Sequence, residues 1–277
     1  TALFESEDPK VGERPSWGTC LFNYASNEVL SFLISSAMFW VEKFHFDGLR
    51  VGALSSMLYL DYCKNDGEWT PNRYGGKENL EAINFVKRLN TALHLFKPQA
   101  LTFAEENTSW PKLTHPVEEG GLGFDYKCNM GWTNDMLHYM SLDPLWRPFN
   151  HDNLTYSFFY AFSEHFLLPI SHDKVSHGKG SLINKIPGDY DQKFAGMRAF
   201  FTYMYAHPGK KLVFMGNEIG QFDEWDVNSA IEWNLLDYEK HMKLKLFFQK
   251  LNEFYVFNKP LYELDSSWKG FDWIHHD

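Results

Sequence analysis

Cysteine is scarce in this 277-residue sequence, and its three cysteines stand far apart at Cys20, Cys63 and Cys128. An odd number without a C-x-x-C pair argues against a disulfide framework and against a cysteine-based zinc site. Cysteines of this kind are typical of a reducing compartment, so we expect a cytoplasmic protein.

Long hydrophobic runs and an excess of basic residues are also missing. No apolar stretch reaches the roughly 18 residues of a membrane-spanning helix, and no signal peptide is recognisable. The 36 acidic residues outnumber the 26 basic ones, so the net charge is −10. That sign disfavours nucleic acid and anionic membranes as partners, whereas it leaves uncharged ligands such as sugars open.

Aromatic residues, in contrast, are plentiful and make up 18% of the sequence. Their flat faces can stack on sugar rings, which fits a carbohydrate-binding protein. Large aromatic side chains also fill the cores of α/β proteins, and this second role accounts for most of them. The composition is therefore compatible with a carbohydrate function without requiring it.

Apolar periodicity predicts strands and helices that alternate along the chain. The expected strands are residues 46–51, 100–104, 124–128, 166–170 and 211–215. The expected helices are residues 27–43, 54–60, 80–93, 134–139, 154–164, 189–206 and 238–257. This alternation without a sequence repeat indicates a parallel sheet and the α/β class. The strands are too few to close an eight-stranded barrel, so we expect a partial (β/α)8 TIM-type barrel that is truncated at both ends.

Polar clusters follow four of the expected strands, around residues 50–52, 105–106, 172–173 and 217–218. In a (β/α)8 barrel the active groups lie at the carboxyl ends of the strands. On the strand 46–51, side chains alternate in direction, so Arg50 and position 52 share one face. An arginine facing a barrel mouth needs an anionic partner, yet position 52 is Gly52. The alternative is a surface turn between strand and helix, for which glycine is suited.

Two carboxylates are candidates for acid and base chemistry. Glu105 follows the apolar strand residues 100–104, and apolar surroundings favour the role of a proton-donating acid. Its alternative is the acidic first turn of a helix. Asp173 follows His172, and its alternative is a helix N-cap. His172 and His177 have no third ligand nearby, so we predict no metal site.

Seven stretches resemble the α-glucan (glycogen and starch) branching enzymes, members of the α-amylase clan. The text DGLRV-x-A-x-x-SMLYLDY resembles the fourth-strand motif of that family, and TFAEENTSWP resembles its AEEST-x-WP stretch. LLPISHDKVSHGKGSL resembles LP(L)SHDEVVHGK-x-SL. Four further stretches match in the same order: GEWTPNRYGGKENLEA, GLGFDYKCNMGW, PGDY-x-QKFA and AHPGKKLVFMGNEIGQ-x-x-EW. The similarity therefore covers essentially the whole chain.

The resemblance implies a role for each candidate residue. Gly52 stands where the family has its aspartate nucleophile, and Glu105 corresponds to the acid/base. Asp173 corresponds to the aspartate that clasps sugar hydroxyls in the transition state. Arg50 corresponds to the arginine that orients the nucleophile, and His172 to a sugar-binding neighbour.

The resemblance also implies an activity, which is glycosyl transfer from an α-1,4-glucan to the 6-hydroxyl of a glucan with retention. The implied partners are glycogen, amylose and amylopectin, and no metal or organic cofactor is expected. It further implies that residues 1–258 are the C-terminal part of the barrel and that residues 259–277 begin a C-terminal β-domain. The chain starts within loop-like sequence, so we interpret it as a piece of a longer protein.

Three departures from the family pattern bear on activity, and one of them is that the family's histidine-bearing motif after the third strand is absent from this piece. Gly52 removes the nucleophile, and Asp47 is a poor substitute because it points to the other face of the strand. Lys174 stands where the family has a glutamate, which inverts a charge beside Asp173. We therefore expect a branching-enzyme fold with impaired activity. The alternatives are a non-catalytic glucan-binding or partner-binding pseudoenzyme, and a debranching or hydrolytic relative, which MGNEIGQ and GEWTPN disfavour.

Overall fold

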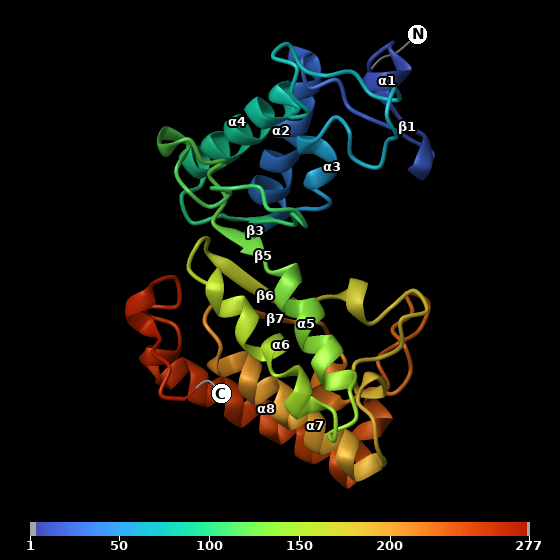
Figure 1. Ribbon diagram of the computed structural model, residues 1–277, viewed down its shortest axis with the longest axis vertical. Coiled ribbons are helices and arrows are strands. Elements are labelled where there is room, and N and C mark those ends of the chain that lie inside the picture. The colour runs from blue at the N-terminus through green and yellow to red at the C-terminus, as the bar shows by residue number, and fades with distance from the viewer. Residues whose placement is uncertain (1–3, 276–277) are drawn as a thin grey trace. The chain divides into compact units, whose positions relative to one another are not determined.

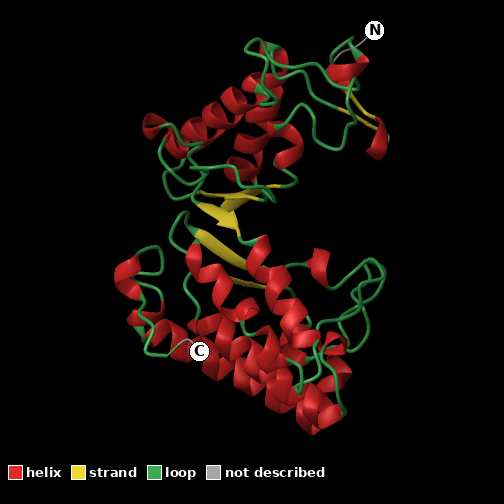
Figure 2. Cartoon of the chain, viewed as in Figure 1, coloured by secondary structure: helices red, strands yellow, loops and turns green. Residues whose placement is uncertain are grey.

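The computed structural model describes residues 4–275, and the chain forms two compact units, Thr1–Lys127 and Cys128–Asp277. Strands and helices follow one another along both units, as Figure 1 shows from the blue N-terminal end to the red C-terminal end. Figure 2 shows that helices and loops make up most of the chain and that the strands are short.

The described part of the first unit contains a small antiparallel ribbon, a parallel sheet and four α-helices. Its helices are α1 (Pro9–Gly12), α2 (Asn27–Lys43), α3 (Ser55–Leu58) and α4 (Leu80–Phe96). Its strands are β1 (Glu13–Arg14), β2 (Thr19–Cys20), β3 (Gly48–Val51), β4 (Leu101–Ala104) and β5 (Tyr126–Cys128), the last of which ends at the boundary. Strand β4 pairs in parallel with both β3 and β5, and β1 pairs antiparallel with β2.

Helices α2 and α4 of the first unit lie side by side (Figure 1). Each begins at a polar cap, because the side chains of Ser26 and Asn79 accept hydrogen bonds from backbone N–H groups of the first turn. Their apolar faces bury Leu30 and Phe85 against Leu54 of the β3–α3 turn. This packing holds the turn after β3 against the two helices.

The second unit is mainly helical around two parallel strands. Its helices are α5 (Met130–Ser141), α6 (Asp152–Thr155), α7 (Tyr190–Ala206) and α8 (Glu239–Phe257), and its strands are β6 (Phe166–Ile170) and β7 (Lys210–Val213). Strand β6 is buried at every position, which explains its uninterrupted apolar sequence. Helix α7 begins with a capping box between Asp189 and Gln192.

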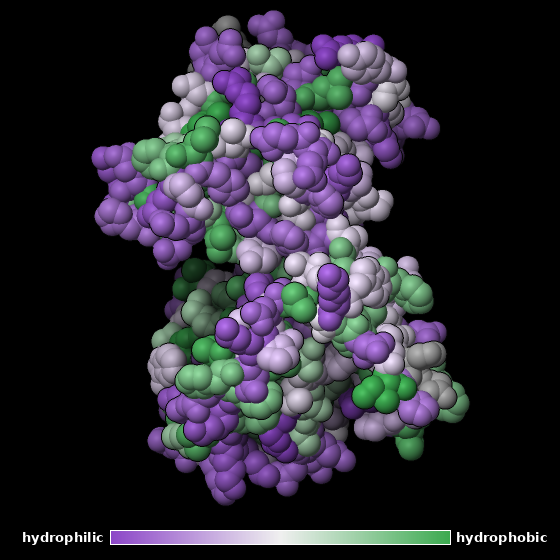
Figure 3. All heavy atoms as spheres, turned by 90° about the vertical axis from the view of Figure 1, so that its left-hand side faces the viewer, coloured by the Kyte–Doolittle hydropathy of each residue, from purple (hydrophilic) through white to green (hydrophobic). Residues whose placement is uncertain are grey.

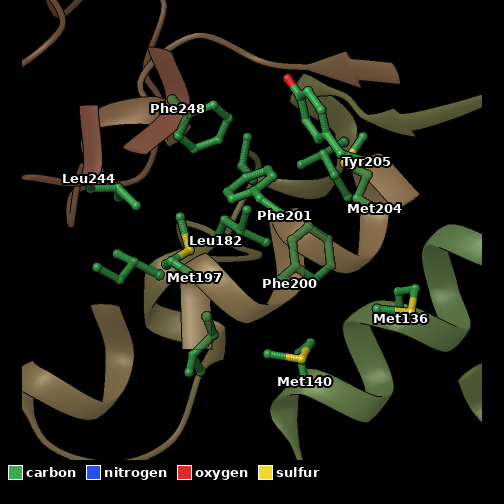
Figure 4. Packing of buried hydrophobic residues seen from close by; sticks show 14 of the residues in the cluster. Met136, Met140, Leu182, Met197, Phe200, Phe201, Met204, Tyr205, Leu244 and Phe248 are labelled. Carbon is green, nitrogen blue, oxygen red and sulfur yellow. The ribbon is translucent and has the colours of Figure 1, made fainter. Parts of the chain in front are cut away.

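The core of the second unit is formed by α5, α7 and α8 (Figure 4). Phe201 of α7 and Phe248 of α8 have ring centroids 4.3 Å apart, and Met140 of α5 belongs to the same cluster. Leu168 and Ile170 bring β6 into this cluster, so the strand is held against the helices along its length.

The predicted elements are largely confirmed, and the α/β class with them. The helix at 27–43 and the strand at 166–170 have the expected bounds. The helix expected at 154–164 is wrong, because the chain forms the short α6 and then a 3-10 helix, Tyr156–Phe159. Burial of Phe158 explains the change, since its ring stacks on Phe271 at 4.2 Å and lies 4.4 Å from the His207 ring.

Two further observations concern the ends and the surface of the chain. Beyond residue 258 the described part contains the 3-10 helices Lys259–Leu261 and Trp268–Gly270, and the division at 258/259 stays a prediction. Within residues 4–275 no helix is both long enough and apolar enough to cross a membrane. Figure 3 shows a face with many hydrophilic side chains and smaller groups of hydrophobic ones between them.

Candidate active site

Strand β3 delivers Arg50 to the end of the parallel sheet of the first unit. Leu49 and Val51 pack into apolar clusters on the opposite face, as the alternation of side chains along a strand predicts. Val51 lies opposite Ala104 of β4, and the backbone N–H of Glu105 donates to the Val51 carbonyl at 3.0 Å. The register therefore places Glu105 beside the residue that follows β3.

Arg50 and Glu105 form an ion pair, with Nη2 2.7 Å from Oε2. The side chains are 31% and 17% exposed, so solvent only partly screens the pair. The Ala53 N–H donates to the same Oε2 at 3.4 Å, and Ala53 has a left-handed backbone with φ of +49°. This turn aims its N–H at the carboxylate, and Oε2 is thereby held from two sides. 

Gly52 leaves open space beside this ion pair. A Cβ atom built at position 52 has one heavy atom within 4 Å, Oε2 of Glu105 at 3.4 Å, which is an ordinary van der Waals contact. The predicted alternative for Glu105, the first turn of a helix, is wrong, because an irregular loop follows β4. The structure thus brings together three predicted site residues: Arg50, Gly52 and Glu105. Their catalytic roles stay predictions.

Sequence reasoning missed the function of Glu106 in shaping this site. Its carboxylate is buried, with Oε1 accepting hydrogen bonds from the Ser55 hydroxyl at 2.8 Å and the Thr108 N–H at 2.7 Å. Oε2 lies 2.9 Å from Nζ of Lys127. Glu106 therefore fixes the loop that carries Glu105. The signal in the sequence was the adjacent pair of glutamates, since neighbouring residues of an extended chain point to opposite sides.

Asp173 and His172 belong to the second unit, in a 3-10 helix (His172–Lys174) that directly follows β6. His172 Nε2 lies 3.1 Å from Asp173 Oδ1, and the Ser171 hydroxyl donates to Asp173 Oδ2 at 3.4 Å. The predicted alternative for Asp173, an N-cap, is wrong because Ser171 holds that position. The convergence of Asp173 with Glu105 on one sugar stays a prediction.

Lysines gather beside Asp173. Lys174 donates to Asn134 Oδ1 at 2.9 Å, and Lys179 donates to the Asp173 carbonyl at 2.7 Å. Both lysines line an open cavity of about 510 Å³ together with Lys185, whose pKa is lowered by burial. Among residues 4–275, no group of three histidine, cysteine, aspartate or glutamate side chains is placed to hold a metal ion.

Sequence comparison finds relatives of this chain among individual proteins. No protein-family profile matches the chain. The 1,4-alpha-glucan branching enzyme GlgB of Cutibacterium acnes is 53% identical over 277 residues, which is 100% of this chain and 43% of that protein. The protein of the same name from Methylobacillus flagellatus is 55% identical over 99% of this chain and 38% of its own length. The chain thus spans well under half the length of these relatives.

Solved structures with similar folds have low sequence identity to the chain. The type III pullulan hydrolase from Thermococcus kodakarensis matches 93% of this chain and 42% of its own, with a TM-score of 0.60 and 18% identity. A cyclic alpha-maltosyl-(1→6)-maltose hydrolase from Arthrobacter globiformis matches 93% of this chain and 53% of its own, with a TM-score of 0.60 and 16% identity. These likenesses concern the fold, and the prediction of a partial (β/α)8 barrel is confirmed. Along its whole length, this chain belongs to the family of 1,4-alpha-glucan branching enzymes.

Proposed function

We propose that this chain is the glucan-binding part of a branching-type active site in which glycosyl transfer is impaired. The observation that carries the proposal is the open space at Gly52 beside the ion pair of Arg50 and Glu105. The partners are α-glucans such as glycogen, amylose and amylopectin, and not nucleic acid, and the setting is the cytoplasm.

The complete reaction needs two carboxyl groups. A nucleophilic carboxylate attacks C1 of the α-1,4-glucan while Glu105 protonates the departing oxygen, so one C–O bond forms as another breaks. In the second step Glu105 accepts the proton from a glucan 6-hydroxyl, which displaces the carboxylate and creates an α-1,6 branch. Two inversions at C1 give net retention.

Gly52 has no atom that can form the first of these bonds. Arg50, whose counterpart would orient the nucleophile, is paired with Glu105 instead. Loss of one member of a catalytic unit typically costs ~10⁴–10⁶ in rate. Sugar binding does not depend on that bond, and Asp173 and His172 are the residues that would contact sugar hydroxyls.

A second candidate is a non-catalytic glucan-binding pseudoenzyme. Gly52 favours it because the covalent step is lost, and Lys174 favours it because a cation stands beside Asp173. The two candidates share a substrate and differ in whether any turnover remains.

The experiment uses the protein in its full natural length and measures glycogen binding and amylose branching separately. We expect retention on glycogen in affinity electrophoresis and almost no change in the iodine colour of amylose. Asp173→Asn should weaken retention, whereas Asp66→Asn, at an exposed loop position, should not. Absence of glycogen retention, or rapid branching by the natural protein, would contradict the proposal.

A further inference from the structure

Arg14 is a fully buried cation of strand β1 in the first unit. Its relative exposure is 0%, and it is among the largest fully buried side chains. Nη2 donates to the Ser56 carbonyl at 2.7 Å, and Nη1 donates to the Tyr62 carbonyl. These bonds link strand β1 to the segment that follows β3, and both acceptors are neutral.

Among the described residues, no carboxylate forms an ion pair with Arg14. Burial lowers its pKa, and the opposing influences come from weakly acidic groups, the Cys63 thiol and the phenols of Tyr62 and Tyr24. Its Nε atom is buried and has no hydrogen-bond partner in residues 4–275. Guanidinium stays charged in proteins, so a buried one without an anion is costly.

Two aromatic rings fix the guanidinium group. Its central carbon lies 5.3 Å from the centroid of the Trp17 ring and 5.1 Å from that of Tyr62. The two rings meet edge to face at 5.9 Å. These cation–π contacts hold the fork of donors in one orientation, so a ligand does not have to order it.

A cavity of about 110 Å³ adjoins Arg14. Its lining includes the cations Lys10 and Lys64 and one carboxylate, Glu81. Burial is the main cause that lowers the pKa of Lys64, and the charge of Arg14 lowers it further, whereas Asp8, Glu68 and Glu13 raise it. Among the residues that line the cavity itself, the three cations Lys10, Arg14 and Lys64 outnumber the one carboxylate.

Neutral donors complete the lining. Tyr24 lines the cavity, and burial raises the pKa of its phenol to about 12, so it remains a hydrogen-bond donor at neutral pH. The cavity holds roughly four water volumes, which is the size of a small oxyanion and too little for a sugar chain.

We propose that this cavity binds a small tetrahedral oxyanion, either inorganic phosphate or the phosphate group of a monoester, through Arg14, Lys10 and Lys64. Guanidinium is suited to this ligand because its planar donors match the oxygen atoms of phosphate. The anion supplies the missing counter-charge and joins the β1 segment to the turn after α3. Gly52 and Glu105 are not among the residues that line this cavity.

The test is isothermal titration of the full natural protein with sodium phosphate at constant ionic strength, with sodium chloride as the reference. We expect saturable binding of one phosphate that Arg14→Gln weakens tenfold or more, the loss typical of a charged hydrogen bond. Arg88→Gln, which removes the same charge at an exposed position of α4, should leave affinity unchanged.

Lys64→Gln provides a second variant in case Arg14→Gln does not fold, and it should weaken binding several-fold. Equal binding of glucose 1-phosphate would support a site that accepts monoesters, and binding of inorganic phosphate alone would support an enclosed ion. The proposal is overturned if phosphate gives no saturable heat, if chloride competes equally well, or if Lys64→Gln binds as tightly as Arg88→Gln.

Discussion

Replacing Gly52 with aspartate supplies the nucleophilic carboxylate that the proposed reaction requires. The position can accept it, because a Cβ there meets only Glu105 Oε2 within 4 Å, at 3.4 Å. Gly52 is not among the glycines with positive φ, so an L-amino acid fits its backbone without strain. The new carboxylate also gains Arg50 as a partner. We therefore expect Gly52→Asp to fold normally.

The geometry supports a large gain in rate. A retaining mechanism needs carboxyl groups about 5–5.5 Å apart. A carboxyl carbon lies one bond beyond the Cβ atom, so a side chain directed away from Glu105 meets that distance. Since loss of a catalytic group costs ~10⁴–10⁶ in rate, or roughly 5–8 kcal/mol of barrier, Gly52→Asp should raise kcat by at least ~10⁴.

The assay is amylose branching by the full natural protein, followed by the iodine colour and by the chain ends that appear after debranching. Gly52→Asn is the matched control, because it fills the same space without a nucleophilic carboxylate, and it should stay inactive. Comparable turnover by the natural protein and Gly52→Asp would refute the reasoning, as would an asparagine variant as active as the aspartate variant.

Three further changes test the packing. Lys127→Met leaves the buried carboxylate of Glu106 without its cation and should lower the free energy of unfolding, measured by urea denaturation, by about 3–5 kcal/mol. Adding Glu106→Gln to this variant should recover part of the loss. Leu168→Ala empties a fully buried site and should cost about 2–5 kcal/mol, whereas Leu145→Ala, at 79% exposure, should cost almost nothing. Burial lowers the pKa of His207 from 6.5 to about 3, so only the unfolded chain takes up this proton between those values. Stability should therefore fall by about 1.4 kcal/mol per pH unit as the pH drops through that window, and His207→Gln should flatten the dependence; an unchanged slope would contradict it.

The sequence alone was sufficient to predict elements whose apolar and capping residues have the same role in the structure. Strand β6 is an apolar run that is buried throughout, and α7 carries its own capping box at Asp189. The segment 154–164 shows the opposite case. Its helical pattern gives way because Phe158 stacks on Phe271, a residue far away in the sequence. Contacts of this kind override local propensity.

The candidate site also has parts that the sequence predicts and parts that it does not. The direction of Arg50 followed from strand alternation, and the resemblance pointed to Glu105. The ion pair of Glu106 with Lys127 could not be predicted from the sequence, because it joins the loop after β4 to β5 and depends on which strands become neighbours. Arg14 was equally hidden, because its burial results from tertiary packing.

The anchoring of Glu106 has a consequence for how this protein can change over generations. Its bonds to Ser55, Thr108 and Lys127 hold the neighbouring loop without help from position 52. A substitution at position 52 therefore leaves these contacts of Glu106 in place, so the neighbouring loop keeps its anchor whichever residue stands there.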